Sequence, residues 1–472
     1  MSLWLRPCEG NPTFIGASSN LRSSKLAALR NSISNSVLRD SDNFELEAEN
    51  IRSDFEQSEK VVVAVINQTE QKMSGDSRGG EFSQHWLLVL VCAVGIGVGV
   101  SALPFYTQGI FIEAWIADFG WTRAQASLGI LGSTLALAAA LPFIGLIVDR
   151  YGLVKPVTVS LLGLSVAYVL LGMFVQSIAT FVTLAMLQAI LGSASSPLAY
   201  TRAINTVFNR QRGLALGVAL SGAGVAATFG PALISKAIVA FGWRGAYFAM
   251  AIFTLMVGAL VVAVLSRLNG AKTPVNIDTE IASEDFRMAK ESRTYWTIMA
   301  AVFSLSLGLG GLMIHFVPVL LEIGFVTNEA AQIAGVIGIA VVLGRLLVGF
   351  AVDRIFAPHV AIAILLACTA GVLALALFGS LAALPAAFVI GFSVGAEVDL
   401  IGYLVARYFG IHAYGQIYGR QYSTFLIATG LSPVILGAIR DATGAYTASL
   451  FTATAFMIVS AALFAKLPKF EK

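Results

Sequence analysis

The chain has little charge for its length. Of its 472 residues, only 12% are charged and 57% are hydrophobic, whereas about 25% of the residues of a soluble domain are charged. A globule in water cannot hide this much apolar surface, so the composition excludes a soluble fold and predicts an integral membrane protein. The formal net charge of +3 does not indicate nucleic-acid binding. Basic residues are better interpreted as markers of membrane topology.

Cysteine is scarce as well. Cys8, Cys92 and Cys368 are the three cysteines, and none has the spacing of a metal site or a disulfide framework, so we interpret them as packing residues. A phosphate-binding Gly-x-x-x-x-Gly-Lys-Ser/Thr motif and a His/Cys cluster are also missing from the sequence. We therefore expect no metal, no cofactor, no ATP hydrolysis and no enzymatic activity.

Residues 1–84 differ from the rest of the chain. They are rich in Ser, Asn, Arg and Glu and contain no run of about 20 apolar residues that would span a membrane. This composition favours a disordered extension. The basic, Ser-rich stretch 21–39 loosely resembles an organelle transit peptide, and a third alternative is that the natural chain starts at Met73.

Long apolar runs fill the chain after residue 84. Each is long enough to cross a hydrocarbon core of about 30 Å as a helix, and none has the alternation of barrel strands. We predict an all-α membrane protein with two six-helix bundles, 85–266 and 294–472, a cytoplasmic linker at 267–293, and a monomeric state. The predicted spans are 86–106, 126–148, 156–175, 181–207, 214–241, 246–265, 295–321, 330–352, 360–378, 383–405, 418–439 and 446–464.

Lys and Arg residues lie mainly on one side of these spans. The linker, the C-terminal tail and the loops at Arg150, Arg210, Arg354 and Arg407 share that side. By the positive-inside rule, this distribution predicts that both termini lie in the cytoplasm.

Two patterns occur once in each half. Gly-x-x-x-Asp-Arg occurs at 145–150 and 349–354, and Gly-x-x-x-Gly occurs at 213–217 and 415–419. The repeated order indicates a duplicated bundle, and such duplicates place a substrate path at their interface near the bilayer midplane.

The charged residues of the first pattern lie at the predicted membrane surface. We interpret Asp149, Arg150, Asp353 and Arg354 as gate residues, because an acid at one helix end can bind the N-terminus of a neighbouring helix and release it later. The alternative is that they only mark topology.

Arg345 breaks the duplication, because the first half has Leu141 at the matching place. It lies eight residues before Asp353, so about 12 Å into the membrane, where a charge costs about 2.5–3.5 kcal/mol. A guanidinium fits a carboxylate in a two-point fashion. We interpret Arg345 as a substrate-binding cation; the alternative is an ion pair with Glu397 or Asp399.

Three further ionisable residues lie within predicted spans. Glu397 and Asp399 point to opposite helix faces. One is a candidate proton carrier while the other pairs with Arg407 or a loop group; alternatively, both lock helices together. His315 suits a proton relay or a hydrogen bond to a substrate carboxylate, and its alternative is a satisfied interior histidine.

Tyr106, Tyr200, Tyr403 and Tyr422 are weaker candidates. Their hydroxyls are able to orient a carboxylate, but tyrosines near span ends are often interfacial anchors. Arg202, two residues after Tyr200, is expected to snorkel to the cytoplasm.

The string Gly145-x-x-x-Asp149-Arg150-x-Gly152 is similar to the loop motif of the major facilitator superfamily, and the resemblance covers residues 85 to the end. Within that superfamily, the strings at 119–124, 212–217 and 242–247 resemble bacterial monocarboxylate and oxalate–formate transporters. This resemblance implies the bacterial inner membrane and gives Arg345 the role of holding a substrate carboxylate. Oxalate–formate exchangers carry a second cation, a lysine, in the eleventh span, which is missing here and favours a monocarboxylate.

The sequence therefore predicts a secondary transporter that moves a small organic monocarboxylate by alternating access with a proton. The lipid bilayer, the organic anion and H+ are its expected partners, without nucleic acid. The alternatives are an efflux transporter for an amphipathic compound and a non-transporting receptor on the same fold.

Overall fold

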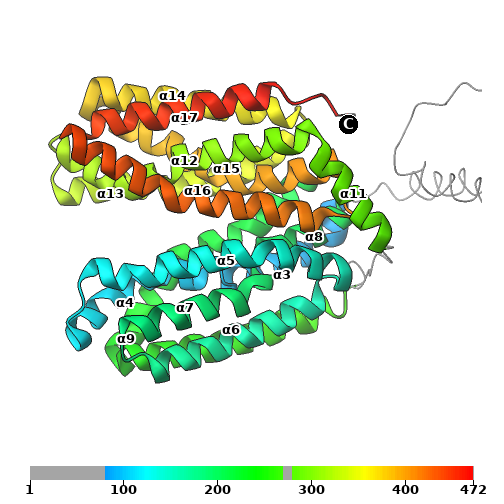
Figure 1. Cartoon of the computed structure of the whole chain (residues 1–472), viewed down its shortest axis with the longest axis horizontal. Helices are drawn as coiled ribbons and strands as arrows, with labels where there is room; N and C mark the ends of the chain where they lie inside the picture. Colours follow the sequence, from blue (N-terminus) through cyan, green and yellow to red (C-terminus); the bar gives the residue numbers. More distant parts are fainter. Residues whose placement is uncertain (1–79, 269–278, 471–472) are drawn as a thin grey trace, which may run out of the picture. The chain divides into compact units, whose positions relative to one another are not determined.

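The computed structural model describes residues 80–268 and 279–470, and all regular elements in these ranges are helices. The expectations for residues 1–79, including a start at Met73, lie outside the described residues. Figure 1 shows α3 to α9 in one layer and α12 to α17 in another. The α-helices are α3 (Glu81–Val98), α4 (Leu103–Phe119), α5 (Arg123–Tyr151), α6 (Val154–Phe174), α7 (Ile178–Gly192), α8 (Pro197–Val207), α9 (Arg212–Leu265), α11 (Thr279–Glu291), α12 (Arg293–Glu322), α13 (Thr327–Val352), α14 (Ala357–Phe378), α15 (Ala383–Phe409), α16 (Tyr414–Thr443) and α17 (Tyr446–Ala465).

Ten helical segments of the described chain are long and apolar enough to cross a membrane. Two of them, with 54 and 53 residues, would be about 80 Å long, which is more than twice the hydrocarbon core of about 30 Å. The first turns back at Gly242, whose φ of 70° favours glycine, and the second turns at the short helix η2, Gly379–Ala382. Each long segment therefore contains two crossings, and the total is the predicted twelve.

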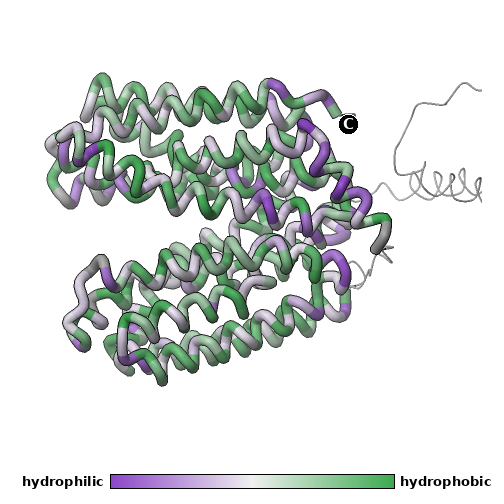
Figure 2. The backbone as a smooth tube through the Cα atoms, in the orientation of Figure 1, coloured by the Kyte–Doolittle hydropathy of each residue, from purple (hydrophilic) through white to green (hydrophobic). Residues whose placement is uncertain are grey.

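Two bundles account for these crossings. In the first bundle α3 and α6 pack on α9, and α5 packs on α7; in the second, α13 packs on α15 and α12 packs on α16 and α17. Figure 2 shows mainly hydrophobic residues along both layers and more hydrophilic residues at the end where α11 lies. The linker predicted as a polar segment thus contains a helix, which is held to the second bundle by a 3.1 Å contact between Asp285 and His412.

The first span differs from its predicted bounds of 86–106. It breaks after Val98 and resumes as α4 at Leu103, which continues to Phe119. The Ser195 hydroxyl accepts a hydrogen bond of 3.1 Å from the backbone N–H of Val100 inside the break. This contact satisfies one donor that the interrupted helix leaves unpaired.

The bundles meet where α5 packs on α16 and α9 packs on α13. Glycines make the approach possible: a Cβ atom at Gly145 would collide with the Gly415 carbonyl, and a Cβ atom at Gly213 would collide with the Gly349 carbonyl. We call the half of the molecule with these contacts, which contains Asp149, the closed half. In Figure 1 it is the end where α8 and α11 lie.

The same helix faces have fewer neighbours in the other half. A Cβ atom at Gly335 or Gly338 of α13, or at Gly430 of α16, would meet no heavy atom within 4 Å in the described chain. On α5, Leu131 lies four turns from Gly145 on the same face and is 47% exposed. The bundles therefore separate here, and we call this half the open half.

Candidate functional site

Arg345 lies where the closed half ends. Its side chain is 7% exposed, and one guanidinium N–H donates to the Leu220 carbonyl of α9. Its Nε has no hydrogen-bond partner among the described residues, and its own carbonyl lies against Gly217. A guanidinium from the second bundle thus reaches the first bundle, with part of its hydrogen-bonding capacity unused.

Asp399 lies beside this guanidinium. Its carboxylate is 4% exposed, and neither oxygen accepts a hydrogen bond from a described residue. It interacts electrostatically with Arg345, and its Oδ2 is 3.5 Å from the place of a Cβ atom on Gly217. The ion pairs of the described chain include neither Arg345 nor Asp399, so the predicted alternative of a locked ion pair is not the arrangement observed.

The site combines unmet hydrogen bonds with two opposite charges, whereas most other buried side chains without partners in the described chain, such as Trp115, Tyr168 and Tyr200, are neutral. A buried polar group without a partner costs about 1–3 kcal/mol, and such groups in a native protein need an explanation. Arg345 and Asp399 supply one cation, one anion and three unused polar atoms in one place. The arrangement is suited to binding a small charged ligand and a proton.

Glu397 occupies the opposite face of α15, as the spacing predicts. It forms a hydrogen bond with the Ser306 hydroxyl of α12 inside the second bundle. Arg407, the predicted partner for one of the two acids, instead donates to the Tyr403 hydroxyl at 3.3 Å and to the Asn209 carbonyl at 3.2 Å. Glu397 therefore connects two helices of one bundle and lies in electrostatic range of Tyr422, whereas Asp399 lies against Gly217 of the first bundle.

His315 has partners for both ring nitrogens. Nε2 is 2.9 Å from the Pro433 carbonyl, and Nδ1 is 3.0 Å from the Tyr446 hydroxyl. Because a carbonyl only accepts, Nε2 donates to Pro433, and in a neutral ring Nδ1 then accepts from the Tyr446 hydroxyl. This geometry corresponds to the alternative of a satisfied interior histidine.

The four candidate tyrosines fall into two groups. Tyr422 of α16 lies in electrostatic range of Arg345 and of Tyr106, which comes from the first bundle. By contrast, Tyr200 is fully buried with its hydroxyl against Gly95. Tyr403 lies in the closed half, where its hydroxyl donates to the Val352 carbonyl at 2.8 Å. Of the four, Tyr422 is therefore brought near Arg345, and Tyr106 lies near Tyr422.

An aromatic column on α16 includes residues that the sequence reasoning missed. Tyr414, Tyr418, Tyr422 and Phe425 stack with ring centroids 5.3 to 5.6 Å apart. The four-residue spacing of the three tyrosines was visible in the sequence and predicts side chains on one helix face. The Tyr414 hydroxyl donates to Thr201 of α8 at 3.1 Å, so the column crosses the interface between the bundles.

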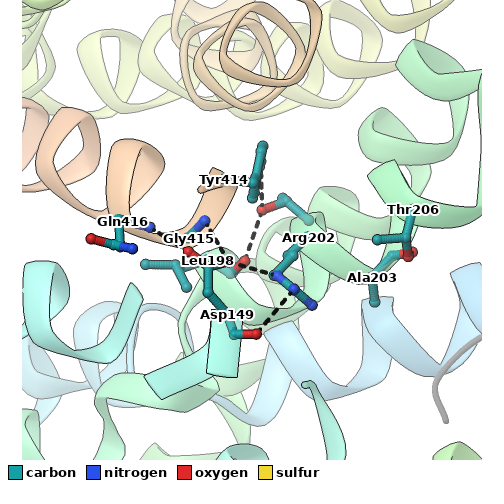
Figure 3. Close-up of polar contacts among 9 residues, drawn as sticks. Asp149, Leu198, Arg202, Ala203, Thr206, Tyr414, Gly415 and Gln416 are labelled. Carbon is teal, nitrogen blue, oxygen red and sulfur yellow. Dashed lines mark hydrogen bonds and ion pairs between the residues drawn. The ribbon is translucent and has the colours of Figure 1, made fainter. Parts of the chain in front are cut away.

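Asp149 joins the bundles in the closed half (Figure 3). Its carboxylate accepts hydrogen bonds of 2.9 Å from the backbone N–H groups of Gly415 and Gln416, at the N-terminus of α16. It also accepts a bond of 2.8 Å from Nε of Arg202. The expectation that Arg202 snorkels to the cytoplasm is wrong, because this arginine is 4% exposed and paired with the acid.

Asp353 makes the equivalent contact in the second half. Its carboxylate accepts hydrogen bonds from the backbone N–H groups of Gly213 at 2.7 Å and Leu214 at 3.0 Å, at the N-terminus of α9. Burial raises the pKa of this carboxyl, and the two hydrogen bonds oppose that rise. Arg150 and Arg354 lie over the rings of Tyr151 and Phe350 instead.

Twelve crossings in two similar bundles, with buried ionisable groups at their interface, are the architecture of a secondary transporter. The Major Facilitator Superfamily family description matches residues 94–433, and the chain belongs to this family. Its family and structural relatives are transporters, not enzymes.

Two groups of relatives are informative. Rat monocarboxylate transporter 12 is 26% identical over 310 residues, which are 58% of this chain and 64% of the relative. Bovine monocarboxylate transporter 13 is 27% identical over 315 residues, or 64% of this chain and 71% of the relative. The chain thus covers less than two thirds of the first relative. Both are animal proteins, so they give no support to a bacterial origin.

Solved structures share the fold. A variant of the E. coli fucose:proton symporter has a TM-score of 0.64 at 14% identity and covers 80% of this chain and 97% of its own. A proton:xylose symporter has a TM-score of 0.62 at 12% identity, with 82% and 96% coverage. At such identities the similarity concerns the fold alone.

Proposed function

We propose that the protein is a secondary active transporter that moves a small organic monocarboxylate together with a proton. The observation that carries this proposal is the pair of Arg345 and Asp399, which are buried at the bundle interface with unfilled hydrogen bonds. The relatives named monocarboxylate transporters support the substrate class, and the buried carboxyl of Asp399 supports coupling to a proton.

Arg345 binds the substrate carboxylate. Its free Nε and a neighbouring N–H form the planar fork that suits two carboxylate oxygens. Tyr422, which lies in electrostatic range of the guanidinium, orients the anion, and Tyr106 of the first bundle lies near Tyr422. A single buried cation here matches a single substrate charge.

Asp399 carries the proton. While ionised, it attracts the Arg345 guanidinium and competes with the substrate anion. When a proton enters from the open half and binds Asp399, this competition ends and Arg345 is free for the substrate. Anion and proton then occupy the site together, so the loaded site has no additional net charge to move across the membrane.

The closed half faces the cytoplasm, because the linker and most basic loops lie on that side. Asp149 and Asp353 hold it closed through the helix N-termini of α16 and α9. These contacts must break when the bundles rock to open the inner side, which is the gate role proposed for the two acids. Arg150 and Arg354 border these acids at the membrane surface.

The experiment is uptake of radiolabelled monocarboxylates into proteoliposomes with an imposed pH gradient. Arg345→Leu should abolish uptake, whereas the matched control Arg287→Leu, at an arginine that is 71% exposed, should not. Unchanged uptake by Arg345→Leu would overturn the substrate role. Asp399→Asn should leave uptake insensitive to the pH gradient. Wild-type uptake that does not depend on the gradient would contradict coupling to a proton. Ligand binding without uptake would favour the receptor alternative.

A further inference from the structure

Tyr418 has a buried hydroxyl without a hydrogen-bond partner in the described chain. The side chain is fully buried, and its ring is stacked between Tyr414 at 5.4 Å and Tyr422 at 5.6 Å. Stacking accounts for the ring but leaves the hydroxyl unexplained. Burying such a group lowers the stability of the fold by about 1–3 kcal/mol. A phenylalanine at this position would therefore be more stable unless the hydroxyl has a function.

Gly402 shows what surrounds this hydroxyl. A Cβ atom there would lie 3.1 Å from the Tyr414 hydroxyl, 3.5 Å from the Tyr418 ring and 3.8 Å from Cβ of Thr201. Gly402 follows Asp399 by one helical turn on the same face of α15. Tyr418 is also in electrostatic range of Asp399, and its hydroxyl lies close enough to Thr201 to interact with it, although without the geometry of a hydrogen bond. The hydroxyl therefore lies between an acid of the second bundle and a hydroxyl of the first.

We propose that Tyr418 is a positioning residue that transmits the charge of Asp399 to the contact between the bundles. The inference rests on the proposed role of Asp399 as proton carrier. While Asp399 is ionised, the Tyr418 hydroxyl leans toward it and donates a hydrogen bond. Once Asp399 is protonated, the hydroxyl donates to Thr201 instead and holds the closed half together. The proton enters from the open half and stays on Asp399, and Tyr418 keeps its own proton throughout.

Thr201 has the capacity for this second contact. Its hydroxyl donates to the Pro197 carbonyl at 2.9 Å and accepts from Tyr414 at 3.1 Å. A threonine oxygen has two lone pairs, so one acceptor position remains for Tyr418. The first bundle thus offers a place for the hydroxyl when Asp399 no longer attracts it.

Among the described residues, the charge that acts on Asp399 is that of Arg345 from α13. The backbone of Gly217 on α9 also lies beside this carboxylate. On its own helix, Glu397 points to the other face and bonds to Ser306. A change at Tyr418 that leaves these groups in place therefore reports on the hydroxyl itself.

The test measures amide hydrogen exchange in the N-terminal turns of α8 and α16 between pH 5 and 8 on the purified full chain. Exchange is corrected for the intrinsic effect of pH, and no substrate is needed. Protection of wild type should change with a single midpoint. Tyr418→Phe keeps the stacked ring and should raise that midpoint by about half a pH unit to one unit, because a charge-assisted donor to the ionised acid is lost. Tyr168→Phe removes another buried hydroxyl without a partner in the described chain, on α6 of the first bundle; it is the matched control and should leave the midpoint unchanged.

A second variant should shift the pH midpoint of amide protection in the opposite direction. Thr201→Val removes the acceptor that the protonated state uses, so the midpoint should fall. Asp399→Asn should abolish the transition. If wild type shows no transition, or if Asp399→Asn keeps it, the proposed proton carrier is wrong. If Asp399→Asn abolishes the transition and Tyr418→Phe leaves its midpoint in place, only the role of Tyr418 is overturned.

Discussion

The two halves of the molecule differ in where each carries a buried arginine. When the repeated Gly-x-x-x-Gly patterns are aligned, Arg202 of the first half falls opposite Leu404 of the second. At the interface the exchange is reversed, with Leu141 in the first half and Arg345 in the second. All four side chains are buried. Each half thus has one arginine where the other has a leucine.

The surroundings of the two arginines are different. Arg202 pairs with Asp149 at 2.8 Å, and both side chains are 4% exposed. Arg345 donates to the Leu220 carbonyl and keeps an unpartnered Nε within the described chain. Burial of a charge alone therefore does not indicate a binding site. An unused donor on a buried charge is the better indicator, and of these two arginines Arg345 is the one that keeps such a donor within the described chain.

The largest effect on uptake is expected when Arg345 of the second half is replaced by leucine, the residue that the first half has at the matching position. Arg345→Leu should lower monocarboxylate uptake by at least about 100-fold, because each hydrogen bond from a charged donor contributes about 1.5–3 kcal/mol. Arg345→Lys keeps the charge without the planar fork and should give an intermediate KM. Initial rates in proteoliposomes measure both variants. A Lys variant no better than the Leu variant would argue against a carboxylate held by two contacts.

Arg202→Leu makes the first half like the second and should act on the gate instead. It leaves the buried Asp149 carboxylate without its cation, and breaking a buried ion pair typically costs about 3–5 kcal/mol. Thermal unfolding should therefore shift downward, and a cysteine placed at Ala138, whose carbonyl accepts a hydrogen bond from Ser423 across the bundle interface, should label faster. Adding Asp149→Asn should restore part of the stability. Equal stability of the single and double variants would show that Arg202 and Asp149 are not coupled.

Part of this comparison was predictable from the sequence. The repeated Gly-x-x-x-Asp and Gly-x-x-x-Gly patterns lie close to helix ends, so an acid capping a neighbouring helix was a sound expectation for Asp149 and Asp353. Long apolar runs similarly predict twelve crossings, because only helices of that length satisfy their backbone in lipid. Arg345 was recognised because its counterpart is a leucine.

What the sequence could not supply are partners that are distant in the sequence. Whether Arg202 snorkels or pairs depends on Asp149, 53 residues away, and local patterns contain no such information. His315 finds Tyr446, 131 residues later, and the Pro433 carbonyl. These pairings appear only once the helices are packed.

A third prediction compares the loss of stability caused by a glycine substitution in the closed half with that in the open half. Gly145→Ala places a Cβ atom against the Gly415 carbonyl, so it should push α5 from α16 and destabilise the closed half by about 1–3 kcal/mol. Gly335→Ala is the matched control, because its Cβ atom meets no described atom within 4 Å. Thermal unfolding of the purified variants measures the difference. Equal losses for both would contradict the division into a closed and an open half.

The smallest effect separates two tyrosines that the sequence left equal. Tyr422→Phe removes a hydroxyl next to Arg345 and should raise KM for the transported monocarboxylate about five-fold with little change in kcat, which corresponds to one neutral hydrogen bond of about 1 kcal/mol. Tyr200→Phe removes a hydroxyl that has no partner among the described residues and should leave KM unchanged. Concentration series of uptake in the same vesicles measure both. A higher KM for Tyr200→Phe than for Tyr422→Phe would indicate that the substrate binds inside the first bundle and not at the interface between the bundles.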